Sequence, residues 1–144
     1  MNGSISIRVP LPPTVNTYWR MVTIPKVGAR MLISADGREY RETIIRFARA
    51  GIIPRHAVSG KLAVFATVYP PDRRARDLDN LWKGLLDALK HAEVIRDDAD
   101  IDDLHMVRGT LRKNDGQVDL VITEIAGGAI DSGELFGSGE QAAQ

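Results

Sequence analysis

The sequence predicts an α/β (α+β) fold, and three patterns carry this prediction. Residues 5–9 and 62–69 are apolar or alternating runs of the length of a strand. Residues 78–89 carry apolar side chains at intervals of three and four, which is the spacing of one helix face. The chain of 144 residues is long enough for one compact domain with a hydrophobic core.

The first half of the chain is expected to contain short extended segments followed by a helix. The first strand ends at a proline-rich segment, because proline fixes φ and has no backbone N–H to donate. Residues 16–20 are expected to form a loop or a short extended piece, and residues 31–33 a second short strand. Ser34 or Asp36 is suited to cap a helix that runs to about residue 50.

The second half predicts a strand, the main helix and two closing strands. The strand at 62–69 stops at two prolines, and the apolar helix follows. Two further strands are expected at about 101–111 and 117–125. Because Asn114-Asp115-Gly116 has the turn chemistry of a hairpin, these two strands are expected to pair with each other.

Residues 1–126 are expected to form the domain, and residues 127–144 a disordered acidic tail. The tail is rich in Gly, Ser and Ala, and its last fourteen residues carry three acids and no base. The chain has no cysteine, which excludes disulfides and thiolate zinc sites. No apolar run approaches the length of a membrane span and the first residues do not form a signal peptide, so we expect no membrane partner and a cytoplasmic location.

The charges are separated along the chain, although the formal net charge is zero. Residues 1–55 carry nine Lys or Arg against three Asp or Glu, whereas residues 72–103 hold ten of the nineteen acids. For nucleic-acid binding, the distribution of charge matters more than its sum. A mixed, solvated surface would explain the same numbers, so charge alone does not decide the function.

An acidic cluster lies where the strand at 62–69 gives way to the main helix. Asp77 and Asp79 stand at the helix start, Lys83 follows one turn later, and Asp97-Asp98 come after the helix. Taken singly, Asp79 would be a helix N-cap, and Lys83 would form an i, i+4 ion pair with Asp79 or Asp87. Taken together with the adjacent arginines, which suit phosphate, they predict a metal-assisted cleavage of a nucleic-acid backbone. Asp98 completes this site only if the chain folds back after the helix.

At these residues the chain resembles the RusA-type Holliday junction resolvases of bacteria and their prophages. The resemblance rests on Pro71-Asp72-Arg73-Arg74, Arg76-Asp77-Leu78-Asp79-Asn80-Leu81, Lys83 and Asp97-Asp98. Weaker similarity is present in Pro12-Pro13-Thr14-Val15-Asn16-Thr17-Tyr18 and in Ser34-Ala35-Asp36-Gly37 with Tyr40-Arg41. It covers roughly residues 5–126.

The resemblance implies a small mixed β-sheet packed by two main helices, in a homodimer. The dimer would bind four-way junction DNA and nick two opposing strands in DNA recombination and repair, leaving 5′-phosphate and 3′-hydroxyl ends. The implied catalytic residues are Asp77, Asp79, Asp98 and Lys83. The three aspartates would hold Mg²⁺, with Mn²⁺ as the alternative ion.

The remaining expected site residues support the metal site or contact DNA. Asn80 and Asp97 are implied as supporting residues. The expected DNA contacts are Arg73, Arg74, Arg76, Asn16 and Arg20. The further acids of the cluster are expected to be solvated, and these are Asp100, Asp102 and Asp103.

Two other functions remain open on the sequence. A different metal-dependent nuclease, acting on flaps, nicks, other branched DNA or RNA, would use the same aspartates with a differently shaped basic surface. A DNA-binding module without catalysis would need the acids only to cap and solvate the helix.

Overall fold

Four strands form one mixed sheet in the order β1–β6–β4–β5. The computed structural model describes residues 3–113 and 115–126, so the expected tail at 127–144 lies outside the described residues. β1 (Ser4–Val9) and β4 (Leu62–Tyr69) pair antiparallel with β6 (Gln117–Glu124), and β5 (Ile101–Arg108) pairs parallel with β4. The mixed sheet is confirmed, and β4 has the bounds that its apolar run predicted.

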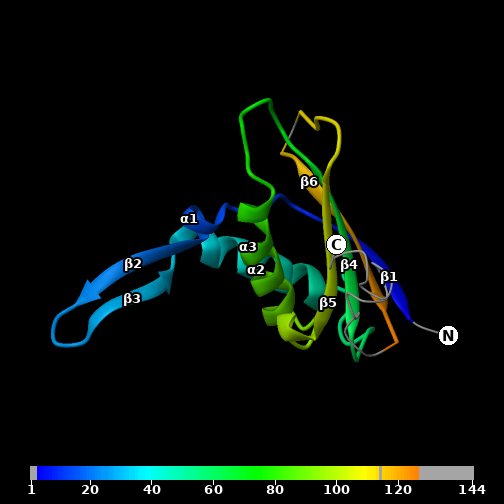
Figure 1. Ribbon diagram of the computed structural model, residues 1–144, viewed down its shortest axis with the longest axis horizontal. Coiled ribbons are helices and arrows are strands. Elements are labelled where there is room, and N and C mark those ends of the chain that lie inside the picture. Colours follow the sequence, from blue (N-terminus) through cyan, green and yellow to red (C-terminus); the bar gives the residue numbers. More distant parts are fainter. Residues whose placement is uncertain (1–2, 114, 127–144) are drawn as a thin grey trace, which may run out of the picture.

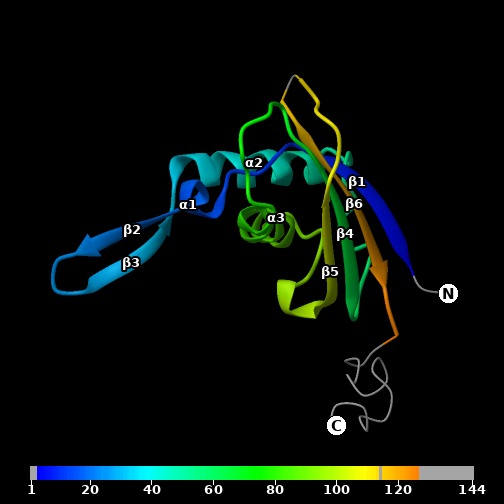
Figure 2. The ribbon, with the colours of Figure 1, turned by 45° about the horizontal axis from the view of Figure 1, so that its top comes forward.

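Two helices, α2 (Ala35–Arg49) and α3 (Asp79–His91), lie on the same side of this sheet (Figure 1, Figure 2). Ser34 caps α2 as expected, because its Oγ accepts a hydrogen bond from the backbone N–H of Gly37 at 3.0 Å. The apolar stripe of α3 is buried together with the inward-facing residues of β4 and β6. Among the described residues, no helix has the length and apolar character needed to cross a bilayer.

β5 and β6 do not form the predicted hairpin, because β4 lies between them. β4, α3 and β5 form a βαβ unit, in which the helix makes the crossover that two parallel strands require. The chain then crosses the end of β4, where the N–H of Gly109 donates to the carbonyl of Val68 at 2.7 Å. The turn residues signal a reversal of the chain but not which strand it meets, so the predicted pairing was wrong.

A separate two-stranded hairpin projects away from the main sheet (Figure 1). It consists of β2 (Trp19–Ile24) and β3 (Gly28–Ile33), with the short helix α1 (Val15–Tyr18) at its base. The sequence predicted the end of β3 but missed β2, because Pro25 and Gly28 are typical of a loop. In the structure Pro25 is the first residue of the hairpin turn and Gly28 is the first residue of β3, and Lys26 between them has a positive φ of 66°.

Candidate active site

Asp77 and Asp79 lie at the N-terminal end of α3 with exposed side chains. Leu78 occupies the N-cap position and α3 has no side-chain capping bond, so Asp79 does not cap the helix. Within residues 3–113 and 115–126, neither carboxylate takes part in an ion pair, whereas the nearby acids Asp72 and Asp87 are both paired with arginines. Two adjacent unpaired carboxylates repel each other unless a cation lies between them. This end of α3 is therefore chemically suited to a metal ion.

Lys83 lies one turn further along α3 and is also exposed. It forms no ion pair within the described part of the chain. Its possible helical partner Asp87 is occupied by Arg41, whose Nη2 lies 2.8 Å from Asp87 Oδ2. Lys83 instead lines a pocket of about 200 Å³ together with Val15, Trp19 and Met31. The ammonium group is thus free to meet an anion next to Asp77 and Asp79.

Asp98 lies at the opposite end of α3. It begins the short 3₁₀ helix η1 (Asp98–Asp100), which follows the C-terminal end of α3 and contacts it. Asp97, its neighbour, lies 3.7 Å from Lys90 Nζ in the last turn of α3. Since α3 has 13 residues, it separates the two ends by roughly 20 Å.

The course of β5 also places Asp98 far from Asp77 and Asp79. Asp98 precedes the start of β5, whereas Arg108 at the end of β5 donates to the carbonyl of Arg76 at 2.9 Å, next to Asp77. Consistent with this, no group of three His, Asp or Glu side chains among the described residues could hold a metal ion. The chain does fold back after α3, but it brings Asp98 to the wrong end for a site within one chain.

The charged groups around Asp98 are paired. Asp97 caps η1, since its Oδ1 accepts from the N–H of Ala99 at 3.1 Å, and this bond is the main cause that lowers the pKa of Asp97. Asp100 was expected to be solvated but is only 7% exposed. It accepts two hydrogen bonds from Arg96, at 2.6 and 3.1 Å, which explains how a buried carboxylate is tolerated. That expectation was wrong.

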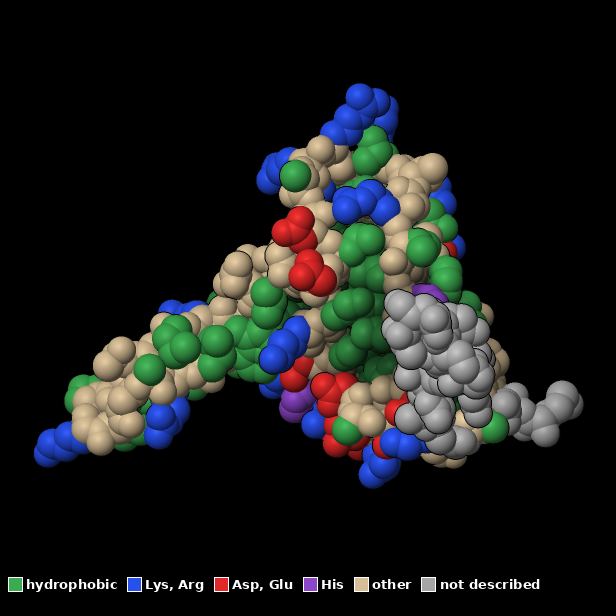
Figure 3. Space-filling view, viewed as in Figure 1, with side chains coloured by type: hydrophobic (Ala, Val, Ile, Leu, Met, Phe, Trp, Pro, Cys, Tyr) green, Lys and Arg blue, Asp and Glu red, His purple; other side chains and the backbone are tan. Residues whose placement is uncertain are grey.

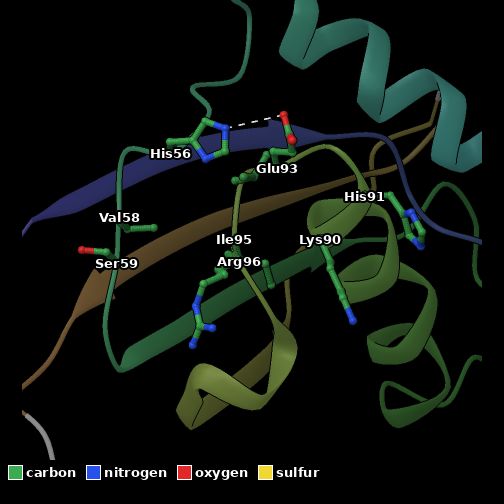
Figure 4. A pocket seen from close by; sticks show the side chains of 9 residues that line it. His56, Val58, Ser59, Lys90, His91, Glu93, Ile95 and Arg96 are labelled. Carbon is green, nitrogen blue, oxygen red and sulfur yellow. Dashed lines mark ion pairs between the residues drawn. The ribbon is translucent and has the colours of Figure 1, made fainter.

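A pocket of about 530 Å³ also lies at this end of α3 (Figure 4). Lys90 and Arg96 extend from its wall toward η1, while His91 points away from them. His56 Nε2 lies 3.5 Å from Glu93 Oε2. Because its charged side chains are matched by acids, this pocket lacks the unpaired groups found at the other end.

The arginine-rich segment before α3 is organised by Asp72. The Oδ1 of Asp72 accepts from the N–H of Arg74 at 2.9 Å and from Nη1 of Arg76 at 2.8 Å. The bond from Arg76 is the main cause that lowers the pKa of Asp72 to about 2. The Arg76 side chain is only 17% exposed and is held within the loop. Arg73 and Arg74 remain exposed, so they are better placed than Arg76 to contact DNA.

The other expected site residues lie on α1, β2 and α3. Asn16 is exposed on α1, and Arg20 is exposed on β2. Asn80 is half-buried in the first turn of α3, next to Asp79.

The contacts that position α1 beside Lys83 were not predicted from the sequence. Tyr18 is fully buried, and its hydroxyl donates to Asp87, which also binds Arg41 of α2. Burial and this bond raise the pKa of Tyr18, so it stays a neutral donor. Gly84 makes room for the ring, since a Cβ there would lie 2.6 Å from Tyr18 Cδ2. A glycine within an otherwise apolar helix was the available signal.

Comparison with known proteins agrees with the resemblance. Residues 10–126 match the model of the family described as Endodeoxyribonuclease RusA. The crossover junction endodeoxyribonuclease rusA of Enterobacteria phage HK97 is 39% identical over 120 residues, covering 81% of this chain and 92% of the relative. The RusA proteins of Shigella sonnei and Escherichia coli K12 are 35% and 34% identical over 123 residues, each covering 85% of this chain and 97% of the relative. The chain therefore belongs to the RusA endodeoxyribonuclease family.

Proposed function

We propose that this chain is a crossover junction endodeoxyribonuclease that nicks two opposing strands of a four-way DNA junction. The observation that carries this proposal is the group of Asp77, Asp79 and Lys83, which are exposed and unpaired at one end of α3 in a member of the RusA family. DNA recombination intermediates of bacteria and their phages lie in the cytoplasm, which is where we place this activity.

Mg²⁺ is the ion that best suits the site, because its preferred ligands are hard carboxylate oxygens with water in the remaining positions. Asp77 and Asp79 would hold it, and Asp98 would supply the third carboxylate. When bound, the ion supplies Lewis acidity toward the scissile phosphate and toward water. Lys83 neutralises the negative charge that builds on the phosphate during hydrolysis. Arg73 and Arg74 bind neighbouring phosphates, which makes binding depend on salt.

A homodimer completes this site, since Asp98 is too far from Asp77 and Asp79 in one chain. If two copies of α3 lie antiparallel across a two-fold axis, the N-terminal end of each helix meets the C-terminal end of the other. Asp98 of the second copy then joins Asp77 and Asp79 of the first, and the same contact recurs on the other side of the axis. Two equivalent sites in fixed relation match the approximate two-fold symmetry of a four-way junction.

Mixing two inactive variants tests this arrangement. Asp77→Asn and Asp98→Asn should each be inactive alone. In a mixed dimer, one site keeps Asp77 and Asp79 from the Asp98→Asn chain and Asp98 from the Asp77→Asn chain, so it is intact. We expect the mixture to nick one strand of the junction without making the paired cut. If each site were built within one chain, both sites of the mixed dimer would be broken and no nicking would return.

The activity itself is tested on synthetic DNA substrates. Purified protein is incubated with four-way, three-way and linear duplex DNA of matched sequence, in Mg²⁺, in Mn²⁺ and in EDTA. We expect paired nicks in the four-way junction only when metal is present. Equal cutting of linear duplex would instead favour a general metal-dependent nuclease. Junction binding without cutting in any metal would favour a DNA-binding module.

A further inference from the structure

The β2–β3 hairpin has two different faces. Residues that pair across the two strands share a face, so Trp19 and Ile33, Met21 and Met31, and Thr23 and Ala29 lie together. This face carries no charge, although Met21 and Met31 are 62% and 58% exposed. The opposite face contains Arg20 and Arg30, each next to an apolar residue. Exposed apolar side chains on a projecting ribbon indicate a surface that is covered during function.

The uncharged face of the hairpin continues into the site at α3. Trp19 and Met31 line the pocket of about 200 Å³ that also contains Lys83. Hydrophobic side chains along the viewed side of the hairpin extend toward α3 (Figure 3). This volume is below the roughly 300–1,000 Å³ of pockets that hold whole drug-sized ligands, so it suits one flat ring system. The indole Nε1 of Trp19 is buried without a hydrogen-bond partner among the described residues.

The charge of the hairpin favours a polyanion as the occupant. Its strands and turn carry Arg20, Lys26 and Arg30, and the chain has no acid before Asp36. A surface that is apolar on one face and basic on the other suits nucleic acid whose bases are unstacked, because bases stack on apolar and aromatic side chains while phosphates meet the cations.

We propose that the pocket formed by Val15, Trp19, Met31 and Lys83, together with the uncharged face of the hairpin, holds one unpaired base of the strand that is cut. This inference rests on the proposed function. Bases at the centre of a junction are the easiest to unstack, because the continuous stack of base pairs is interrupted there. The base packs against Trp19 and Met31, and its own phosphate is thereby held beside Lys83 and the aspartates. The pocket thus couples the identity of a base to the position of the cut.

Neighbouring residues on opposite faces of β3 provide a matched test. Met31→Ala removes a side chain of the pocket, whereas Leu32→Ala removes a similar side chain, 43% exposed, from the other face. The wild-type cut position is mapped first, and single-turnover cleavage is then measured on a fully paired junction and on one with a single mismatch at that position. We expect Met31→Ala to slow cleavage of the paired junction about tenfold, as loss of one stacking contact does. The mismatch should restore most of the cleavage rate that Met31→Ala loses, and Leu32→Ala should cut like wild type.

A second measurement detects the entry of a base into the pocket without relying on cleavage. Trp82→Phe leaves Trp19 as the only tryptophan. Adding a four-way junction in EDTA should then quench the fluorescence of Trp19, and Met31→Ala in the same background should weaken the quenching while Leu32→Ala does not.

The proposal is overturned if Met31→Ala and Leu32→Ala slow cleavage equally, if the mismatch restores nothing, or if the junction leaves Trp19 emission unchanged. It is also overturned if Met31→Ala dissociates the protein in sedimentation, because the face would then be covered by a second copy. If wild-type protein cuts no junction, the proposed function fails, while Trp19 quenching still decides whether a base enters the pocket.

Discussion

The two ends of α3 both carry several charged side chains but use them differently. At the C-terminal end, Lys90 lies 3.7 Å from Asp97, and Arg96 binds Asp100 at 2.6 Å. At the N-terminal end, Asp77, Asp79 and Lys83 form no ion pair within the described residues. Paired charges stabilise a fold, whereas unpaired charges gathered at one place are retained at a cost to stability. The difference supports the proposal that the N-terminal end is the reactive one.

The comparison also explains why Asp98 looks isolated. It is exposed among paired neighbours, and no group of three His, Asp or Glu side chains in the described part of the chain could hold a metal ion with it. The unpaired state of Asp98 among the described residues is explained if the other metal ligands belong to a second copy of the chain.

Asp77→Asn should abolish cleavage, lowering the rate about 10³-fold or more, because it removes a carboxylate that no protein group can replace. Junction binding should stay the same or tighten, since a charge that repels phosphate has gone. Single-turnover cleavage and gel-shift assays measure the two effects. Asp36→Asn, which changes a first-turn acid of α2, is the control and should cut normally.

Lys83→Ala should reduce cleavage about 10²-fold, the lower range for loss of one electrostatic group that acts in the transition state. Affinity for the junction should fall much less, because the arginines still bind the backbone. Lys61→Ala, which removes a lysine paired with Asp102, serves as the control. Undiminished cleavage by Lys83→Ala would exclude this lysine from the mechanism.

At the other end of α3, Asp100→Ala should destabilise the fold instead. We expect the free energy of unfolding to fall by about 1–3 kcal/mol, because a buried acceptor of two hydrogen bonds from arginine is lost. Asp103→Ala, which removes an exposed acid of β5, the strand that follows η1, should change it by no more than about 0.5 kcal/mol. Urea denaturation measures both values. Equal changes in the free energy of unfolding for the two variants would show that the buried Asp100 stabilises the fold no more than the exposed Asp103.

The smallest expected effect concerns the loop that Asp72 organises. Its pKa is lowered to about 2 in the folded protein, mainly by Arg76, and is about 3.9 in an unfolded chain. The stabilisation that Asp72 provides is therefore fully present above about pH 4 and is lost as the pH falls through about 2. NMR titration of the Asp72 carboxyl should follow this course. A midpoint near 4 would show that the bond to Arg76 does not persist in solution.

The strong local patterns of the chain were reliable predictors. The apolar run at 62–69 predicted β4 with its observed bounds, and the apolar stripe predicted α3. Both patterns are reliable because burial of one face imposes the period of the element on its own residues. Ser34 was found as a cap for the same reason, since the bond it forms is local.

Contacts between distant residues were not predictable in this way. The turn at 114–116 indicated a reversal, yet β4 separates β5 from β6. β2 was missed because its turn residues resemble those of an ordinary loop. Asp100 looked like one more solvated acid until Arg96 was seen to bind it.

The kinds of side chain at the site, and the family that they indicate, follow from the amino-acid order alone, because the relevant acids and lysine lie close together in the chain. Which of these side chains meet depends on the fold. The length of α3 and the parallel course of β5 place Asp98 at the far end from Asp77 and Asp79. A helix has a fixed rise per residue, so its two ends stay apart whatever their charge, and these acids do not converge within one chain. In the proposed dimer they meet across the two-fold axis.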